Sequence, residues 1–275
     1  MKKIQSLTEY HARTVREGAG VKLSRIFGFN GDAPLDPFLL LDHFHSDDPA
    51  DYTAGFPWHP HRGIETVTYL LKGSVRHGDS LGNKGVIGAG DIQWMTAGSG
   101  IIHEEMPEAG DGINGFQLWV NLPAKQKMMD PRYRGITAEE IPVVTDDNGV
   151  TVRVIAGTYG KIAGPVKELV MPVSYLDVTL AADTSYPLDV TDGGFCYLFD
   201  GDAQILDETI PTLTAVQLSQ TCTITAGKSG ARFLFICGKP IGEPVAWYGP
   251  IVMNTQEELR IAFEEYQNGT FIKKK

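Results

Sequence analysis

Two strand-like segments with histidines at alternating positions are the feature that most restricts how this chain can fold. The first segment carries His59 and His61, and the second carries His103 and Glu105 at the same spacing. Side chains of a β-strand alternate between its two faces, so each pair points to one side. Glu65 shares the parity of the first pair, and we expect it to face the same interior. The pattern predicts one metal site, formed where a small antiparallel barrel brings the two strands face to face.

Short runs rich in Val, Ile, Thr and Tyr, separated by turn residues, continue along the rest of the chain. The 31 Gly and 16 Pro among 275 residues favour many turns between short strands over long helices. We therefore expect an all-β protein with two antiparallel β-barrels. Residues 1–135 form the metal-binding barrel and residues 136–275 form a second barrel, with the polar stretch 123–142 as the connection. All seven histidines lie at or before residue 103, so the second barrel is expected to lack a metal site.

One stretch near the end of the sequence has the pattern of an amphipathic helix. Thr255 and Glu258 have the spacing of a capping box, apolar residues follow at helical intervals, and Asn268-Gly269 is a typical stop. We predict a helix over about 255–268 that covers an open barrel edge.

Charge and cysteine content exclude several classes of protein. The formal net charge of −10, with basic residues clustered only at 273–275, argues against direct binding of nucleic acid. The first residues lack the apolar core of a secretory signal, and no apolar run reaches membrane-spanning length, so we expect a cytoplasmic protein without membrane contact. Three cysteines, Cys196, Cys222 and Cys237, lack CxxC spacing and are expected to be buried core thiols.

Other candidate ligands have weaker support from the pattern. His43 and His45 form a second His-x-His, but no separate partner segment matches them, and we assign them to the barrel surface or the domain junction. Glu104 is a carboxylate next to His103, but strand parity turns it to the opposite face.

Longer motifs give the chain a family resemblance. The order Gly-x3-His-x-His-x3-Glu, followed by Gly-Asp-x6-Gly-x4-His, is similar to the two motifs of the cupin superfamily. Four strings go further and resemble the pirin family of bicupins: DPFLLLD at 36–42, HPHRGIETVTY at 59–69, GDIQWMTAGSGIIHEEMP at 90–107 and GPIVMNT at 249–255. They are spread over nearly the whole chain.

The resemblance to pirins implies one mononuclear metal, usually iron, in the N-terminal barrel. Cupins in general take their carboxylate ligand from the position of Glu65, whereas pirins take it from that of Glu105. The resemblance therefore implies Fe(2+) held by His59, His61, His103 and Glu105. The same ligand types also bind Mn, Ni, Cu or Zn. We place Glu65, His77 and Gln117 around these ligands, and expect a structural hydrogen bond from His77.

The resemblance also implies two alternative functions. Pirins are similar to flavonol (quercetin) 2,3-dioxygenases, which cleave the heterocyclic ring of quercetin with O2, and Glu105 would then be the catalytic base. In the alternative, the protein is a metal- and redox-dependent regulator that binds a protein partner, such as a transcription factor or a metabolic enzyme. The sequence alone is compatible with both functions.

Overall fold

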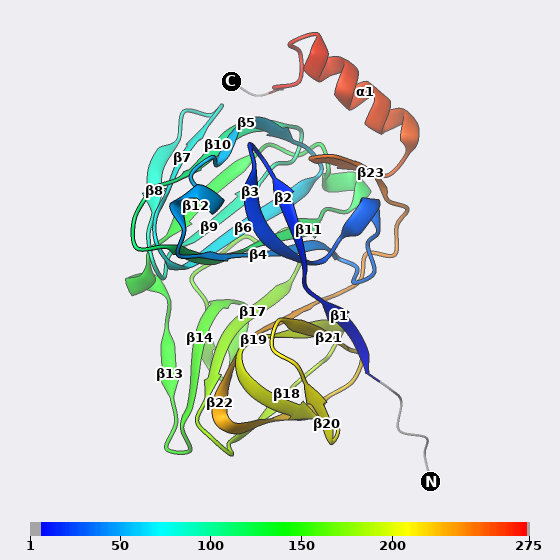
Figure 1. The fold of residues 1–275 in the computed structure, drawn as a ribbon. Helices are drawn as coiled ribbons and strands as arrows, with labels where there is room; N and C mark the ends of the chain where they lie inside the picture. The colour runs from blue at the N-terminus through cyan, green and yellow to red at the C-terminus, as the bar shows by residue number, and fades with distance from the viewer. Residues whose placement is uncertain (1–6, 274–275) are drawn as a thin grey trace. The chain divides into compact units, whose positions relative to one another are not determined.

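A computed structural model of the chain describes residues 7–273. Within these residues the protein is built of antiparallel strands and one α-helix (Figure 1). The chain forms two compact units. Residues 13–140 and 241–273 make up the first, called here the N-terminal unit, and residues 7–12 and 141–240 make up the C-terminal unit. The expectations about a leader segment and a basic end fall mostly on residues 1–6 and 274–275, which lie outside the described part.

The exchange of terminal segments differs from the predicted division. The change of unit after residue 140 is close to the expected boundary, but residues 241–273 make their contacts with the N-terminal unit and not with the second unit. Strand β1 (Thr8–His11), in turn, pairs with β21 (Thr214–Leu218) of the C-terminal unit. Such long-range pairings leave no local mark in a sequence.

Two open sheets form the N-terminal unit. One has the order β12-β9-β6-β11-β4-β3-β2, the other the order β5-β10-β7-β8, and β23 and β24 form a separate pair. The strands of the unit are β2 (Arg13–Glu17), β3 (Val21–Phe27), β4 (Phe38–Ser46), β5 (Phe56–His61), β6 (Ile64–Lys72), β7 (Val75–Asp79), β8 (Lys84–Ile87), β9 (Ile92–Thr96), β10 (Ile101–Pro107), β11 (Ile113–Asn121), β12 (Arg132–Ile136), β23 (Ala246–Tyr248) and β24 (Ile251–Met253). Short 3-10 turns lie at η1 (Phe29–Gly31), η2 (Pro49–Asp51), η3 (Ala124–Gln126) and η4 (Ala138–Glu140).

The C-terminal unit has one large branched sheet. Its main order is β1-β21-β19-β22-β17-β14-β13, with β18 and β20 paired to its sides and a small β15–β16 hairpin. Its other strands are β13 (Val143–Thr145), β14 (Val150–Ala156), β15 (Thr158–Tyr159), β16 (Ile162–Ala163), β17 (Val173–Leu180), β18 (Ser185–Leu188), β19 (Gly194–Ile205), β20 (Glu208–Ile210) and β22 (Cys222–Gly238). Alternate residues of these strands fill a buried apolar core.

Both units confirm the prediction of antiparallel β structure, although neither one closes within residues 7–273. The sheets end in unpaired edge strands, so the two predicted cupin-type units take the form of open β-sandwiches. The two histidine-bearing strands also meet differently from the prediction. β5 and β10 are hydrogen-bonded neighbours in one sheet, with His103 directly opposite His59, instead of facing each other across a barrel.

Part of the predicted connection between domains belongs to the N-terminal unit. β12 lies within the polar stretch 123–142 and pairs with β9 from Arg132 opposite Thr96 to Ile136 opposite Ile92. Its alternation is hard to recognise in the sequence because every residue of the strand is at least partly exposed. Pairing with a neighbour, and not burial, makes this segment a strand.

The predicted helix is confirmed as α1 (Gln256–Gln267). Thr255 accepts a hydrogen bond from the backbone N–H of Glu258, whose side chain returns to the backbone of Thr255, so the capping box is complete. Leu259 and Ala262 are buried in a cluster with residues of β23 and β24, which is the surface that the helix covers. Among residues 7–273, no helix is long and apolar enough to cross a membrane.

The cysteines are free, in agreement with the prediction. Cys196 and Cys237 are buried, and burial raises the pKa of both thiols. Cys222, predicted to be buried, is only half-buried.

Candidate metal centre

Three imidazoles converge between β5 and β10. The candidate ligand atoms of His59, His61 and His103 all lie within 4.8 Å of one another. His59 and His61 point the same way because they alternate on β5, and the register of β10 brings His103 beside them. The structure therefore brings together the three histidines that the sequence pattern predicted.

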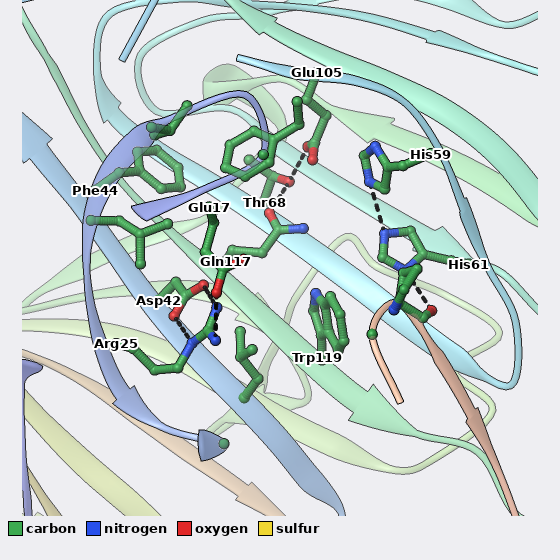
Figure 2. Close-up of a pocket in the computed structure, with 18 of the residues that line it drawn as sticks. Glu17, Arg25, Asp42, Phe44, His59, His61, Thr68, Glu105, Gln117 and Trp119 are labelled. Carbon is green, nitrogen blue, oxygen red and sulfur yellow. Dashed lines mark hydrogen bonds and ion pairs between the residues drawn. The ribbon is translucent and has the colours of Figure 1, made fainter. Parts of the chain in front are cut away.

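The orientation of two rings leaves their lone pairs facing each other. His59 Nδ1 lies 2.9 Å from the carbonyl oxygen of Pro57, and His61 Nδ1 lies 3.0 Å from that of Pro250. A carbonyl can only accept, so each Nδ1 carries the proton, and in a neutral imidazole the other nitrogen is then a bare acceptor. The two Nε2 atoms lie 3.1 Å apart (Figure 2). Two acceptors at this distance require a positive species close to both.

His103 adds a third ring with unused nitrogens. It is fully buried, and neither ring nitrogen has a hydrogen-bond partner among residues 7–273. Its ring centroid lies 4.3 Å from that of His59 and 5.1 Å from that of His61. An orphaned buried nitrogen is costly in a native protein, and metal coordination would remove that cost.

Burial favours the neutral form of all three rings. Desolvation is the largest cause that lowers the pKa of His59, His61 and His103, and the neighbouring imidazoles lower the pKa of His61 and His103 further. Neutral imidazole is the form that binds metal. The three residues thus fit a divalent cation.

Glu105 lies on the same face of β10 as His103, at the wall of the same cavity as His59 and His61. Thr68 Oγ1 is 2.8 Å from Glu105 Oε1 and 2.7 Å from the side-chain oxygen of Gln117. One hydroxyl proton cannot serve both, so Thr68 donates to Glu105 if the Gln117 amide turns its NH2 group to Thr68. This arrangement holds the carboxylate as an acceptor beside the histidines.

Strand parity predicted that Glu65 faces the same interior as the histidines. The structure shows that it does not. The chain turns at Gly63, where φ is 78°, so Glu65 belongs to a new strand, β6, and the alternation of β5 does not extend to it. Its Oε1 accepts hydrogen bonds from Thr96 at 2.5 Å and from Arg134 at 3.1 Å. A side chain at position 63 would collide with the carbonyl of Val252, which explains the glycine.

The remaining candidate histidines have other partners. His77 Nδ1 lies 2.8 Å from Gln93 Nε2, and its ring stacks on Tyr133 with centroids 4.8 Å apart. His43 Nε2 forms a hydrogen bond with Asn114 Oδ1 at 2.9 Å, while the side chain of His45 is exposed. None of them joins the three-histidine group within the described residues.

A cavity of about 800 Å³ opens beside the histidines. Its walls are largely apolar, and the Trp119 ring lies 5.1 Å from that of His61. The other end of the cavity holds an ion pair, in which Arg25 Nε and Nη2 donate to the two oxygens of Asp42, both at 2.8 Å (Figure 2). Volume and composition are those of a site for a small organic ligand.

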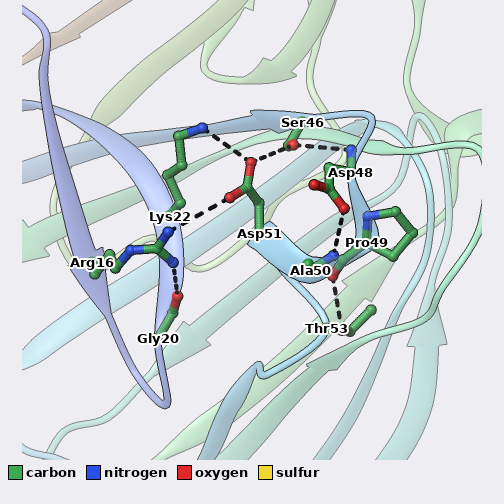
Figure 3. A network of polar contacts seen from close by, with 9 residues as sticks. All are labelled: Arg16, Gly20, Lys22, Ser46, Asp48, Pro49, Ala50, Asp51 and Thr53. Atoms are coloured by element: carbon green, nitrogen blue, oxygen red, sulfur yellow. Dashed lines mark hydrogen bonds and ion pairs between the residues drawn. The ribbon is translucent and has the colours of Figure 1, made fainter.

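The hairpin between β2 and β3 forms one wall of the cavity through Glu17, Gly18 and Ala19. Asp51 fixes this hairpin to the loop that follows β4, because its carboxylate accepts a hydrogen bond from Lys22 at 3.1 Å and pairs with Arg16 at 3.8 Å (Figure 3). The two ion pairs of Asp51 thus fix this wall of the cavity to the neighbouring loop.

Comparison with known proteins agrees with this geometry. The Pirin family profile matches residues 20–120, and the profile of the Pirin C-terminal cupin domain matches residues 175–272. A pirin-like protein of Caulobacter vibrioides is 46% identical over 260 residues, which cover 93% of this chain and 94% of that protein. The chain belongs to the pirin family.

Two further relatives of this pirin carry the name of an enzyme. A Pseudomonas aeruginosa protein with the provisional name quercetin 2,3-dioxygenase is 42% identical over 98% of this chain and 99% of its own length. The crystal structure of a quercetin 2,3-dioxygenase from Acinetobacter baumannii superimposes with a TM-score of 0.87 at 33% identity, over 96% of this chain and 97% of that one. The predicted family and its two cupin domains are confirmed, and such relatives imply a divalent metal at the histidines.

Sequence reasoning missed several residues of the pirin cavity. Arg25 and Asp42 lie on different strands, and their pairing depends on the register of β3 and β4. Asp42 had one recognisable feature, as a lone carboxylate directly after three leucines. Pro250, whose carbonyl orients His61, belongs to the terminal segment that sequence analysis assigned to the other barrel.

Proposed function

We propose that this pirin is a metal-dependent flavonol 2,3-dioxygenase, with quercetin as a substrate and Fe(2+) as its metal. The reaction cleaves the heterocyclic ring, incorporates both atoms of O2 and releases carbon monoxide. The observation that carries the proposal is the set of three clustered neutral imidazoles, two of them buried, with orphaned or opposed nitrogens, beside a cavity of about 800 Å³. When bound, a redox-active divalent metal supplies the chemistry that O2 requires.

The cavity suits a flat aromatic substrate. Its walls include Phe44, Tyr52, Phe56 and Trp119, which bury aromatic surface well. The ring of Trp119 lies 5.1 Å from that of His61, which places an aromatic wall directly beside the metal centre.

Glu105 is proposed as the base that accepts the proton of the flavonol 3-hydroxyl. It lines the cavity near the histidines, and its Oε1 lies 2.8 Å from the hydroxyl of Thr68, which holds the carboxyl group in place. We also propose Glu105 as the fourth metal ligand, as the family resemblance implies.

The test is oxygen consumption by iron-loaded protein supplied with quercetin, measured beside the Glu105→Gln variant. The amide keeps the shape of the side chain but cannot accept the proton, so kcat should fall by about 10²-fold or more while quercetin binding changes little. Gln117→Glu is the matched control for altered charge in the cavity. Release of carbon monoxide identifies the reaction.

Two results would contradict the proposal. One is wild-type protein that consumes quercetin no faster than free iron, and the other is a fully active Glu105→Gln variant. The redox-dependent regulator would then be the leading function, and capture of protein partners by the oxidised and the reduced forms would be the next measurement.

A further inference from the structure

Four polar side chains cross the floor of the cavity in a single row. Thr68 on β6 lies opposite Gln117 on β11, Gln117 lies opposite Asp42 on β4, and Asp42 lies opposite Arg25 on β3. Directly opposed residues of antiparallel neighbours point to the same face of a sheet. All four line the cavity, so this polar row leads from the carboxylate of Glu105 to the ion pair at the other end.

The length of the polar row limits what can use it. It spans three strand spacings, which amounts to roughly 14 Å between the Cα atoms at its ends. A ligand held near the histidines reaches Asp42 only if it is elongated. A flavonol is such a molecule. Its pendant phenyl ring, called here the remote ring, can carry hydroxyl groups on the side that points away from the 3-hydroxyl.

The charges at the far end select the kind of group that can bind there. Arg25 faces two carboxylates, since its Nη1 lies 2.8 Å from Glu17 Oε1 while Nε and Nη2 bond Asp42. Two acids against one guanidinium leave this end with a formal charge of −1, which disfavours an anionic ligand. A carboxylate has about four acceptor positions, and Arg25 occupies two of those on Asp42. The end is therefore suited to neutral hydrogen-bond donors.

The surroundings of the pair restrict the ligand further. The side chain of Asp42 is 7% exposed and that of Arg25 is 15% exposed, so both are largely withdrawn from water. Val21, Leu23 and Phe44 also line the cavity on neighbouring parts of β3 and β4. A hydroxyl group on an apolar ring matches this combination of an apolar wall and the fixed carboxylate of Asp42.

We infer that Asp42, held in place by Arg25, is a specificity-determining residue that accepts hydrogen bonds from the hydroxyl groups on the remote ring of a polyphenol. The inference rests on the proposed function, because it assumes a flavonol whose other end lies at the histidines. Arg25 is a positioning residue, since it fixes the plane of the carboxylate through its two parallel bonds. Gln117 and Thr68 continue the row to Glu105.

The inference is tested by binding, without turnover. Anaerobic calorimetry at pH 8 on metal-loaded protein compares three flavonols that differ only in having two, one or no hydroxyl groups on the remote ring. Burial raises the pKa of Asp42 to about 6, so the carboxylate is ionised at this pH. We expect wild type to bind the dihydroxylated flavonol at least ten-fold more tightly than the unsubstituted one, which corresponds to about 1.4 kcal/mol.

Two variants weaken or remove the acceptor. Asp42→Asn keeps the shape but has only one acceptor oxygen, which the guanidinium of Arg25 is expected to occupy, and its NH2 group cannot accept a hydrogen bond. The double variant Arg25→Met/Asp42→Leu removes the acceptor and both charges, so that no buried charge is left unpaired. Both should bind the three flavonols with affinities within about two-fold of one another. Arg232→Met/Asp177→Leu is the matched control, because Asp177 and Arg232 form a similar bidentate pair in the C-terminal unit. It should keep the preference of wild type.

The outcomes separate this inference from the proposed function. If wild type binds the three flavonols equally, or if the Asp42 variants fold and keep the preference, the inference is wrong and the proposed function stands. If wild type prefers the dihydroxylated flavonol and the variants do not, but no oxygen is consumed, the recognition role stands and the dioxygenase activity is wrong. If metal-loaded wild type binds no flavonol, both are wrong.

Discussion

His103 is the residue on which the metal centre depends most. Its ring is fully buried, and no group in the described part of the chain forms a hydrogen bond with either of its nitrogens. His59 and His61, by contrast, are each oriented by a backbone carbonyl. In this site, hydrogen bonds to backbone carbonyl groups fix the rings of His59 and His61, whereas packing alone fixes the ring of His103.

We expect His103→Ala to abolish tight metal binding and to leave the β-sheet structure intact, because the apolar cores of both units lie elsewhere. Metal analysis and circular dichroism of the purified variant measure the two effects. His45→Ala is the control, since His45 is exposed and belongs to the other His-x-His pair. A variant that keeps its metal, or one that loses its strand signal, would show that this interpretation of His103 is wrong.

Segments of the N-terminal unit are joined at one buried lysine. Lys127 follows η3 and is 1% exposed. Its Nζ donates to the carbonyl oxygens of Gly63 at 2.8 Å and Val252 at 3.1 Å, and to the side chain of Asn121 at 2.6 Å. The three donors of one ammonium thus join the β5–β6 turn, the end of β11 and strand β24.

Lys127→Met should remove three hydrogen bonds to buried acceptors and lower the free energy of unfolding by roughly 3 kcal/mol or more. Denaturant unfolding of metal-free protein at pH 6 is the measurement. Burial lowers the pKa of Lys127 to about 7, so at pH 6 the ammonium keeps all three donors. Lys125→Met, an exposed change on the same turn, should have little effect. Equal stability of the two variants would mean that other groups satisfy these acceptors.

For the whole molecule, the distribution of histidines restricts metal chemistry to one unit. Six of the seven lie within residues 13–140, and only His11 belongs to the C-terminal unit. The ring of His11 lies 3.1 Å from the Thr214 hydroxyl and 3.3 Å from a carboxylate oxygen of Glu9. The C-terminal unit consequently keeps the cupin fold without an imidazole cluster in its described residues.

We expect one equivalent of tightly bound divalent metal per full-length chain, and none in the triple variant His59→Ala/His61→Ala/His103→Ala. A chelator should remove the metal without unfolding the C-terminal unit, whose core contains no ligand. Elemental analysis and thermal unfolding before and after chelation measure both effects. A second equivalent, or metal retained by the triple variant, would contradict the assignment to one site.

The sequence by itself determined those features that depend on local rules. Alternation along β5 and β10 predicted that His59 and His61 share a face, and that His103 shares one with Glu105. The spacing of Thr255 and Glu258 predicted the start of the only described α-helix. Family motifs gave the fold, because they combine strand pattern and turn residues over nearly the whole chain.

Only the tertiary structure decided the features that depend on how distant segments meet. The turn at Gly63 moves Glu65 to a new strand, and the register of β3 and β4 creates the Arg25–Asp42 pair. The terminal segment supplies the carbonyl of Pro250 to His61, although they are 189 residues apart. Strand register and segment exchange are set by the burial and hydrogen bonding of the entire unit, so no local pattern encodes them.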